Sequence, residues 1–348
     1  MNLKFTEQQP LNRAFATCPQ CGQEEHLGVH SYKERRYICY ECNKTFSETI
    51  GTIFYQTHYP IWVILLVITL LANGCPLQAI VTAFYIDERT IANWQKKAGK
   101  FSKKVQEAVV CNGKVELGQV QADELCVNAQ GKKKIWVATG MDVFSRLFLW
   151  GEVSARRDKK LIERLMIGIR ETASSTIAPI LFAVDGFAAY PNAIIKIFHT
   201  KVYTGRRGRP RHITWPNLHI VQVVKSRTGY KLKGVARRLV HGCLNQAYEQ
   251  IFSSQCGLGK INTAYIERLN ATFRARMPVF VRRTRGLART VARIETEMFL
   301  SGVAYNFCTL HTSLDATPAM AAGLTDHIWS MEELFRFRLP QNLLHDGL

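Results

Sequence analysis

The chain has 348 residues, of which 47% are hydrophobic, and it carries 46 Lys and Arg against 27 Asp and Glu. This apolar content excludes an intrinsically disordered chain, and the length allows two or three domains with a sizeable core. The formal charge of +19 favours a polyanionic partner. Nucleic acid is the simplest such partner, and an anionic membrane surface is the alternative.

The first residues contain no apolar segment of the kind found in secretory signals. The longest apolar run, 61–72 (IWVILLVITLLA), is shorter than the roughly 20 residues that span a bilayer, so we expect a buried helix and no membrane partner. Ten cysteines in such a chain indicate thiols and bound metal rather than disulfides. We therefore expect a cytoplasmic protein.

Two CxxC pairs separated by 17 residues lie near the N-terminus: Cys18, Cys21, Cys39 and Cys42. Each pair can present two thiolates to one metal, and the two pairs together complete a tetrahedral zinc site. Because all four positions hold Cys, no coordination position stays open, and we expect one structural Zn²⁺. Strand-forming residues at 32–38 between the pairs indicate a zinc ribbon, which we place at residues 1–52.

Three helical segments are predicted between residues 60 and 101. The run 61–72 is the first, Pro76 suits the first turn of a second that ends near residue 84, and Asp87 suits the N-cap of a third at 88–100. The third segment surrounds its apolar anchors, Ile91 and Trp94, with polar and cationic residues: Arg89, Thr90, Asn93, Lys96 and Lys97. This arrangement predicts a helix-turn-helix module that binds DNA, at residues 53–114 with a helical connector. The alternative is a plain helical linker that packs on the next domain.

Residues 118–150 contain three runs rich in β-branched and aromatic residues, separated by 128–134 and 142–146, which is typical of an antiparallel meander. An amphipathic helix at 158–172, a fully apolar run at 178–184 and a helical pattern at 187–199 follow. This order indicates a mixed α/β sheet of the ribonuclease H type, at residues 115–312. We expect residues 313–348 to form a C-terminal tail with one short helix around 332–337.

Two carboxylates occupy informative places in this pattern. Asp123 lies inside the first run, where a buried acid is costly unless it binds a cation. Asp185 follows the buried run, and strand ends in open sheets are where side chains converge on a ligand. The alternatives are a strand-edge acid paired with Lys or Arg for Asp123, and a turn residue for Asp185, since Asp-Gly is common in turns.

The 63 residues from Gly186 to Tyr248 contain no Asp or Glu but 12 Lys and Arg. Their centre, GRRGRPRHITWPN, is rich in turn residues, and we interpret residues from about 200 to 258 as a basic insertion that binds a phosphate backbone. A solvated basic loop is the alternative. The candidate DNA contacts in this stretch are Arg206, Arg207, Arg209, Arg211, Lys225 and Arg227.

A helix is predicted at 262–277, with a core-facing stripe formed by Tyr265, Leu269 and Phe273. Glu267 lies off this stripe, with Asn270 and Arg274 three and seven residues later. Eight Arg and no acid occur between residues 268 and 293, so Glu267 stands alone in a cationic stretch. Its alternative role is a surface ion pair. A last long helix is predicted at about 287–309.

Asp123, Asp185 and Glu267 would bring three carboxylates from three elements into a basic surface. Such a set is what two-metal phosphoryl transfer requires, with two divalent ions about 4 Å apart. Hard oxygen ligands suit Mg²⁺ or Mn²⁺.

The chain resembles bacterial insertion-sequence transposases of the DDE class, which have a retroviral-integrase-like core. The motifs that carry the resemblance are CPQC and CYEC followed by KTFSETIGT, then DERTIANWQ, QADE with GMDVFSR, FAVDG, and NTAYIERLNATFRARM with RRTRG. It implies that Asp123, Asp185 and Glu267 are the catalytic acids and hold two Mg²⁺. Asp142 falls at a position that is structural in such cores, and Glu124, Glu249 and Glu295 are weaker substitutes. The 82-residue spacing from Asp185 to Glu267 exceeds the compact integrase pattern, and the basic insertion accounts for it.

The resemblance further implies a prokaryotic, nucleoid-associated transposase that binds the terminal inverted repeats of its element as a homodimer or higher oligomer. It would cut DNA at the element's end and join the released 3′-OH to target DNA, with Asn270 and Arg274 positioning phosphate or ligand. Two other classes remain open. One is a non-catalytic, sequence-specific DNA-binding protein, either a regulator or an inactive element remnant. The other is a structure-selective nuclease.

Overall fold

The structure is a computed structural model that describes residues 11, 16–174, 176–203, 209–229, 231–255, 259–281, 290–340 and 343, without the side chains of Lys132, Arg227 and Leu232. The predicted contacts Arg206 and Arg207 and the first residues of the predicted helix 287–309 lie outside this range. In the part of the chain described, no helix is both long enough and apolar enough to cross a membrane.

A small antiparallel sheet follows the first CxxC pair, with strands β1 (Leu27–Ser31), β2 (Arg36–Cys39) and β3 (Thr45–Ser47) in that order. Tyr37 and Phe46 pack against each other inside it, with ring centroids 5.8 Å apart. The prediction of a strand at 32–38 is wrong for its first four residues. Residues 32–35 form the turn between β1 and β2, in which Arg35 adopts a left-handed conformation with φ of 51°, and the strand begins only at Arg36.

The three predicted helices are confirmed as α1 (Ile61–Ala72), α2 (Leu77–Phe84) and α3 (Glu88–Val105). The Asp87 carboxylate caps α3 by accepting hydrogen bonds from the backbone N–H groups of Arg89 and Thr90. The third helix is longer than predicted, because it continues without a break into the π-helical turn η2 (Gln106–Val110). The predicted connector is thus an extension of α3.

The central sheet has six strands in the order β11-β10-β7-β4-β5-β6. The predicted meander forms β4 (Gln119–Ala129), β5 (Lys133–Asp142) and β6 (Phe148–Ser154), with η3 (Gln130–Lys132) between the first two. Strand β7 (Ile180–Asp185) lies parallel to both β4 and β10 (Leu218–Thr228), while β11 (Lys231–His241) is antiparallel to β10. The mixed α/β sheet predicted from the sequence is confirmed.

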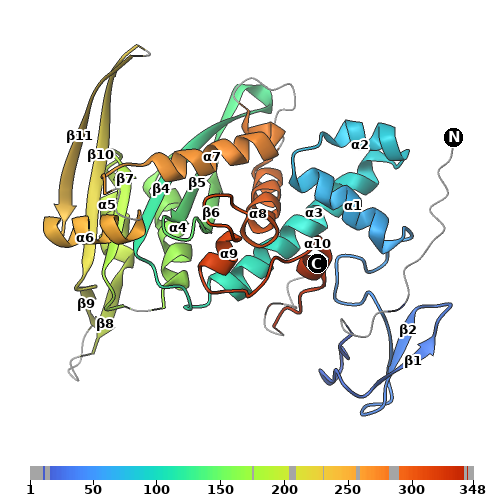
Figure 1. Ribbon diagram of the computed structural model, residues 1–348. Coiled ribbons are helices and arrows are strands. Elements are labelled where there is room, and N and C mark those ends of the chain that lie inside the picture. Colours follow the sequence, from blue (N-terminus) through green and yellow to red (C-terminus); the bar gives the residue numbers. More distant parts are fainter. Residues whose placement is uncertain are drawn as a thin grey trace.

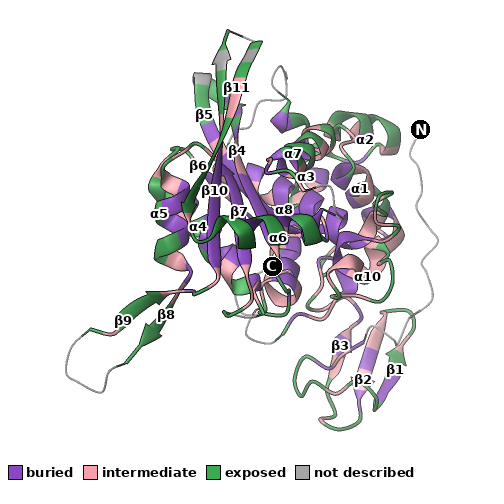
Figure 2. Cartoon of the chain, turned by 60° about the vertical axis from the view of Figure 1, so that its left-hand side comes forward, coloured by how far each residue is buried: buried purple, intermediate pink, exposed green. Residues whose placement is uncertain are grey.

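The interpretation of residues 200–258 as an insertion is wrong for the segment that forms β10, which is a strand of the central sheet. Its first half, LHIVQVV, is mostly apolar and buried between β7 and β11, so it belongs to the sheet rather than to a loop. A separate two-stranded hairpin, β8 (His199–Val202) and β9 (Arg211–Thr214), projects from the body and is mostly exposed (Figure 2). Helix α6 (Leu244–Ser254) then returns to the sheet, where Ala247 and Ile251 are buried.

Helices cover both faces of the central sheet (Figure 1). Helices α4 (Lys159–Thr172) and α5 (Ala189–Ile197) lie on one face, with Ile169 of α4 against Gly140 of β5. The other face carries α6, α7 (Ala264–Arg276), the short η4 (Pro278–Phe280) and α8 (Val291–Cys308). The tail adds α9 (Pro318–Ala321) and α10 (Met331–Arg336), the latter close to the predicted short helix.

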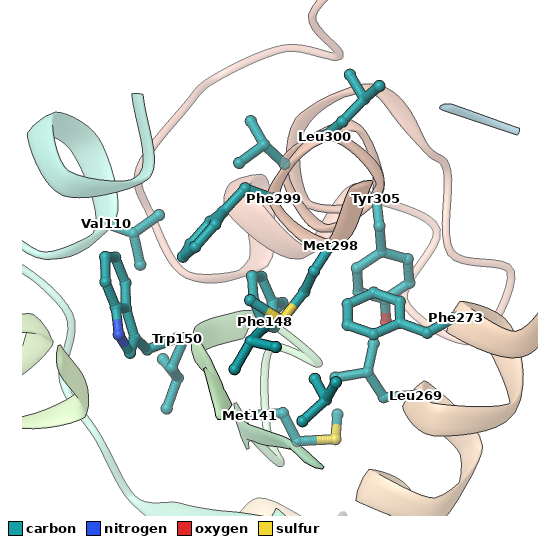
Figure 3. Close-up of a cluster of buried hydrophobic side chains, with 14 of the residues drawn as sticks. Val110, Met141, Phe148, Trp150, Leu269, Phe273, Met298, Phe299, Leu300 and Tyr305 are labelled. Carbon is teal, nitrogen blue, oxygen red and sulfur yellow. The ribbon is translucent and has the colours of Figure 1, made fainter. Parts of the chain in front are cut away.

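Aromatic residues from β6, α7 and α8 form the centre of the core (Figure 3). Phe148 contacts the rings of Phe273 and Phe299 at centroid distances of 5.3 and 6.2 Å. One continuous cluster of buried apolar residues extends from Ile53 to Leu339, and it includes residues of α1, α2 and α3. The helical segment therefore shares its core with the sheet, and α7 is fixed firmly over β4 and β5.

Candidate metal centre and nucleic-acid surface

Asp123 and Asp185 lie side by side at the centre of the sheet. In the parallel register of β4 and β7, Gln121 is opposite Ala183 and Ala122 is opposite Val184. The next residues in this register are Asp123 and Asp185, on the face covered by α6 and α7. Parallel strands place their carboxyl ends at one edge, which is why two acids 62 positions apart in the chain converge.

Glu124 joins these two carboxylates. One oxygen from each of Asp123, Glu124 and Asp185 lies within 4.8 Å of the other two. The Glu124 side chain is only 1% exposed, and it is paired with the guanidinium of Arg157, with Nε 3.2 Å from Oε1. Arg157 also reaches Asp185, with a nitrogen 3.5 Å from Oδ2. From the sequence, Glu124 was predicted to be only a weaker substitute for one of the three catalytic acids. The structure places it in the closest group of carboxylates.

Glu267 lies in the same cavity but outside that group of three. The cavity has a volume of about 710 Å³, and its lining includes Asp123, Glu124, Asp185 and Glu267. The Glu267 side chain is 49% exposed and forms an ion pair with Lys225. Its Oε1 also accepts a hydrogen bond from the Thr263 hydroxyl at 2.8 Å. Glu267 thus faces the other acids across the cavity with a cationic partner of its own.

Two amides hold α7 against β4 beside the acids. Asn270 is fully buried and donates to Asp123 through Nδ2 at 3.0 Å, while its oxygen accepts from the Thr139 hydroxyl at 3.0 Å. Gln121 Oε1 accepts from the backbone N–H groups of Tyr265 and Ile266 at 3.1 and 3.0 Å. These contacts fix the first turn of α7, and therefore the place from which Glu267 enters the cavity.

The turn after β7 is held from behind by Gln222 of β10. Its amide nitrogen donates to the backbone oxygen of Asp185 at 3.1 Å, and its own oxygen accepts from Arg238 Nε at 3.0 Å. On the cavity side, the backbone N–H of Phe187 donates to Asp185 Oδ1 at 2.9 Å. The orientation of Asp185 is therefore fixed from both sides of the sheet.

Burial and the charges of neighbouring acids raise the pKa values of Asp123 and Glu124. Burial raises the pKa of Asp123, and the negative charges of Asp185 and Glu267 raise it further. Burial and the charge of Asp185 raise the pKa of Glu124 to about 7, although Arg157 opposes the shift. Carboxylates arranged in this way have a strong tendency to bind protons or a cation. Their hard oxygen donors fit Mg²⁺ or Mn²⁺.

The remaining candidate acids lie elsewhere. Asp142 is fully buried, and its Oδ2 accepts from the backbone N–H and the hydroxyl of Ser145 at 2.8 and 2.7 Å. Glu295 pairs with Lys103 at 2.7 Å, and Glu249 is exposed on α6. The described lining of the cavity includes none of the three. Arg157 is the functional candidate that sequence reasoning missed, because nothing in its spacing relates it to the acids.

The four predicted zinc ligands meet in the small sheet. The sulfur atoms of Cys18, Cys21, Cys39 and Cys42 all lie within 4.8 Å of one another, and two pairs are 3.5 Å apart. Four convergent thiols form a donor set that suits tetrahedral Zn²⁺. Hydrogen bonds from neighbouring backbone groups and thiols lower the pKa of Cys18 to about 7, against the effect of burial, which favours a thiolate at this site.

The predicted DNA contacts fall on three surfaces. On α3, the side chains of Arg89, Asn93 and Lys96 are exposed, and Ile91 and Trp94 are buried as expected. Thr90 and Lys97 are half-buried, and Lys97 donates to the backbone oxygen of Tyr55 at 3.3 Å. Arg209 and Arg211 are exposed at the β8–β9 hairpin, whereas Lys225 and Arg274 line the cavity. The side chain of Arg227 lies outside the described part of the chain.

A scan against models of protein families finds no match, and a search among curated proteins finds none either. Among solved structures, the chain is similar to a piggyBac transposase from a cryo-EM structure of a synaptic complex with hairpin DNA. The two share 9% sequence identity with a TM-score of 0.37, over 82% of this chain and 70% of the other. A similarity of this size supports no statement about what the chain does.

Proposed function

We propose that the chain is a DNA transposase of the DDE class that binds the terminal inverted repeats of an insertion sequence and catalyses metal-dependent strand cleavage and strand transfer. The observation that carries the proposal is the convergence of Asp123, Glu124 and Asp185 within 4.8 Å, in a cavity that Glu267 also lines. The chain as a whole is strongly basic, with a formal charge of +19.

The topology of the sheet supports a ribonuclease H-like catalytic core. From β4 to β10 the central sheet is built by three antiparallel strands, a helix, a parallel strand, a helix and a second parallel strand, with the separate β8–β9 hairpin inserted before β10. Fold alone does not establish an activity, and it is the group of acids that supports catalysis.

In this proposal Asp123, Asp185 and Glu267 hold two Mg²⁺ or Mn²⁺, and Glu124 supports Asp185 through Arg157. Bound divalent ions would activate the attacking oxygen and stabilise the charge that develops on phosphate. Asn270 holds the Asp123 carboxylate in one orientation, because its amide is itself fixed by Thr139. Arg274 extends from the same helix into the cavity, where it is placed to contact a phosphate oxygen.

The exposed residues of α3 would read the terminal repeats, and the cations of the β8–β9 hairpin would contact backbone phosphates. Arg206, Arg207 and Arg227 stay predictions of the same kind. Replacing Arg89 with Ala should reduce the preference for repeat DNA. Arg211→Ala should weaken binding to every sequence, and it should reduce the slope of the logarithm of the binding constant against the logarithm of salt concentration by about one.

The decisive experiment uses labelled DNA that carries the sequences flanking the gene, which should form imperfect inverted repeats. Asp123→Asn should retain binding to these ends and lose nicking and strand transfer in Mg²⁺. Asp315→Asn is the matched control, because Asp315 is exposed and its left-handed backbone suits Asn. Cleavage by the Asp123→Asn protein at the wild-type rate would contradict the assignment.

The same assay separates the alternatives. A non-catalytic DNA-binding protein would bind the ends without nicking them in any divalent ion. A structure-selective nuclease would nick DNA but leave its 3′ ends unjoined to target.

A further inference from the structure

Three cationic side chains, Arg157, Lys225 and Arg274, line the cavity together with the acids. Arg157 and Lys225 form ion pairs with those acids. Lys225 follows Val223 by two residues on β10, and Val223 pairs with Asp185, so Lys225 points to the same face as the acids. Its ammonium forms an ion pair with Glu267 and lies 3.4 Å from the Thr263 hydroxyl. This places a positive charge on one of the proposed metal ligands.

Arg157 neutralises the opposite side of the cavity. Its guanidinium contacts Glu124 at 3.2 Å and Asp185 at 3.5 Å. It also lies over the Phe187 ring, 4.3 Å from the centroid, which restricts its position. Each group of acids in the cavity therefore has a cation supplied by the chain itself.

These contacts use the same oxygens that a divalent ion would need. Glu267 Oε1 already accepts from Thr263 and contacts Lys225, and Asp185 accepts from both Phe187 and Arg157. A carboxylate has only about four lone-pair directions, so a metal ion that binds Glu267 through Oε1 or Asp185 through Oδ2 competes with the cation already there.

We propose that Lys225 and Arg157 are counter-ions of the carboxylate cluster and compete with divalent metal in the DNA-free chain. When DNA and metal bind, these two side chains leave the carboxylates and contact phosphate oxygens. The inference rests on the proposed function, since it requires that the acids bind metal. It implies positive coupling: DNA that draws Lys225 away from Glu267 strengthens metal binding, and metal strengthens DNA binding by the same factor.

Lys225 offers the cleaner test of the two. Removing Arg157 would leave the buried carboxylate of Glu124 without this partner, which is expected to destabilise the fold. Lys225 is a partly exposed residue whose ion pair contributes at most about 1 kcal/mol, so Lys225→Ala should fold.

The experiment measures Mn²⁺ binding to the full-length, DNA-free chain at low salt by titration calorimetry. Lys225→Ala should bind Mn²⁺ about two- to fivefold more tightly than wild type, the factor that corresponds to a partly exposed ion pair. Lys225→Arg should restore wild-type affinity. Lys233→Ala is the matched control, because it removes the same charge from an exposed position on the neighbouring strand β11.

A second titration in the presence of uncleaved DNA measures the coupling. DNA should raise the Mn²⁺ affinity of the wild type more than that of Lys225→Ala. Equal Mn²⁺ affinities for Lys225→Ala and Lys233→Ala, or equal effects of DNA, would overturn the inference while the metal centre stands. Absence of Mn²⁺ binding by every protein, with and without DNA, would instead remove the metal centre and the inference together.

Discussion

The amide of Asn270 donates a hydrogen bond to the carboxylate of Asp123, with Nδ2 3.0 Å from Oδ2. The two residues are 147 positions apart in the chain, and Asn270 is fully buried between α7 and the sheet. Because the second amide atom is held by Thr139, the Asp123 carboxylate is constrained by an element that does not belong to its own strand. The geometry of the cavity therefore depends on how α7 packs on β4.

Asn270→Ala should reduce both activity and stability. The substitution leaves the buried Thr139 hydroxyl without this acceptor, which costs about 1–3 kcal/mol of unfolding free energy. Loss of the hydrogen bond that orients a metal ligand should lower the nicking rate by about 10- to 100-fold. Urea unfolding and single-turnover nicking measure the two effects. Thr272→Ala on the same helix is the control, and a wild-type rate in the Asn270→Ala protein would separate α7 from the catalytic step.

The CxxC pairs predict one zinc ion per chain. Cys39 is fully buried in the small sheet, so Cys39→Ser should lose zinc and unfold the ribbon, since small zinc modules depend on their metal for folding. Elemental analysis gives the zinc content, and limited proteolysis reports on the ribbon. Cys126→Ser should keep one zinc, because Cys126 is exposed on β4 and lies apart from the four convergent thiols. Full zinc occupancy after the Cys39 substitution would exclude a four-cysteine site.

The C-terminal helix holds the ribbon through a buried ion pair. Arg336 lies 3.7 Å from Glu48, whose other oxygen pairs with Arg35 at 2.6 Å, and the side chains of Arg336 and Glu48 are 4% and 2% exposed. Arg336→Met should lower the unfolding free energy by about 1–3 kcal/mol, because the buried carboxylate of Glu48 loses the cation next to Oε1 and keeps Arg35. Arg164→Met, at the exposed pair with Glu152, should change it by less than about 1 kcal/mol. Equal effects of the two substitutions would show that Arg336 does not stabilise the ribbon.

The sequence was most informative where a pattern is local. The meander, the strand that ends in Asp185 and the cap at Asp87 follow from alternation, apolar runs and turn residues, and the structure confirms them. The strand β10 was missed because its second half continues into the cationic hairpin with β11, so that the charge of the stretch concealed its apolar first half.

The arrangement of the acids depends on contacts that a single sequence does not contain. The convergence of Asp123 and Asp185 follows from the parallel register of β4 and β7. The sequence predicted that the two acids meet, but not this register. The inclusion of Glu124 and the pairing of Glu267 with Lys225 depend instead on side-chain directions across the cavity. Arg157 was not found for the same reason, because it reaches the acids from the segment before α4.

The raised pKa of Glu124 gives a pH dependence with a definite sign. In the folded chain this carboxyl titrates at about 7 rather than 4.5, because it is buried and lies near Asp185. A carboxyl with a raised folded pKa contributes stability that is fully present below about 4.5 and is lost as the pH rises through about 7. The difference corresponds to about 3 kcal/mol of unfolding free energy. Glu124→Gln is neutral at every pH. Its unfolding free energy relative to that of wild type should therefore rise by about 3 kcal/mol between about pH 4.5 and 7. Urea unfolding of both proteins at a series of pH values, without divalent ions, measures the difference in unfolding free energy between Glu124→Gln and wild type. Both proteins lose zinc at acid pH, so this loss does not contribute to the difference. A difference that does not change between pH 4.5 and 7 would show that Glu124 is ionised throughout and that Arg157 outweighs the effect of burial.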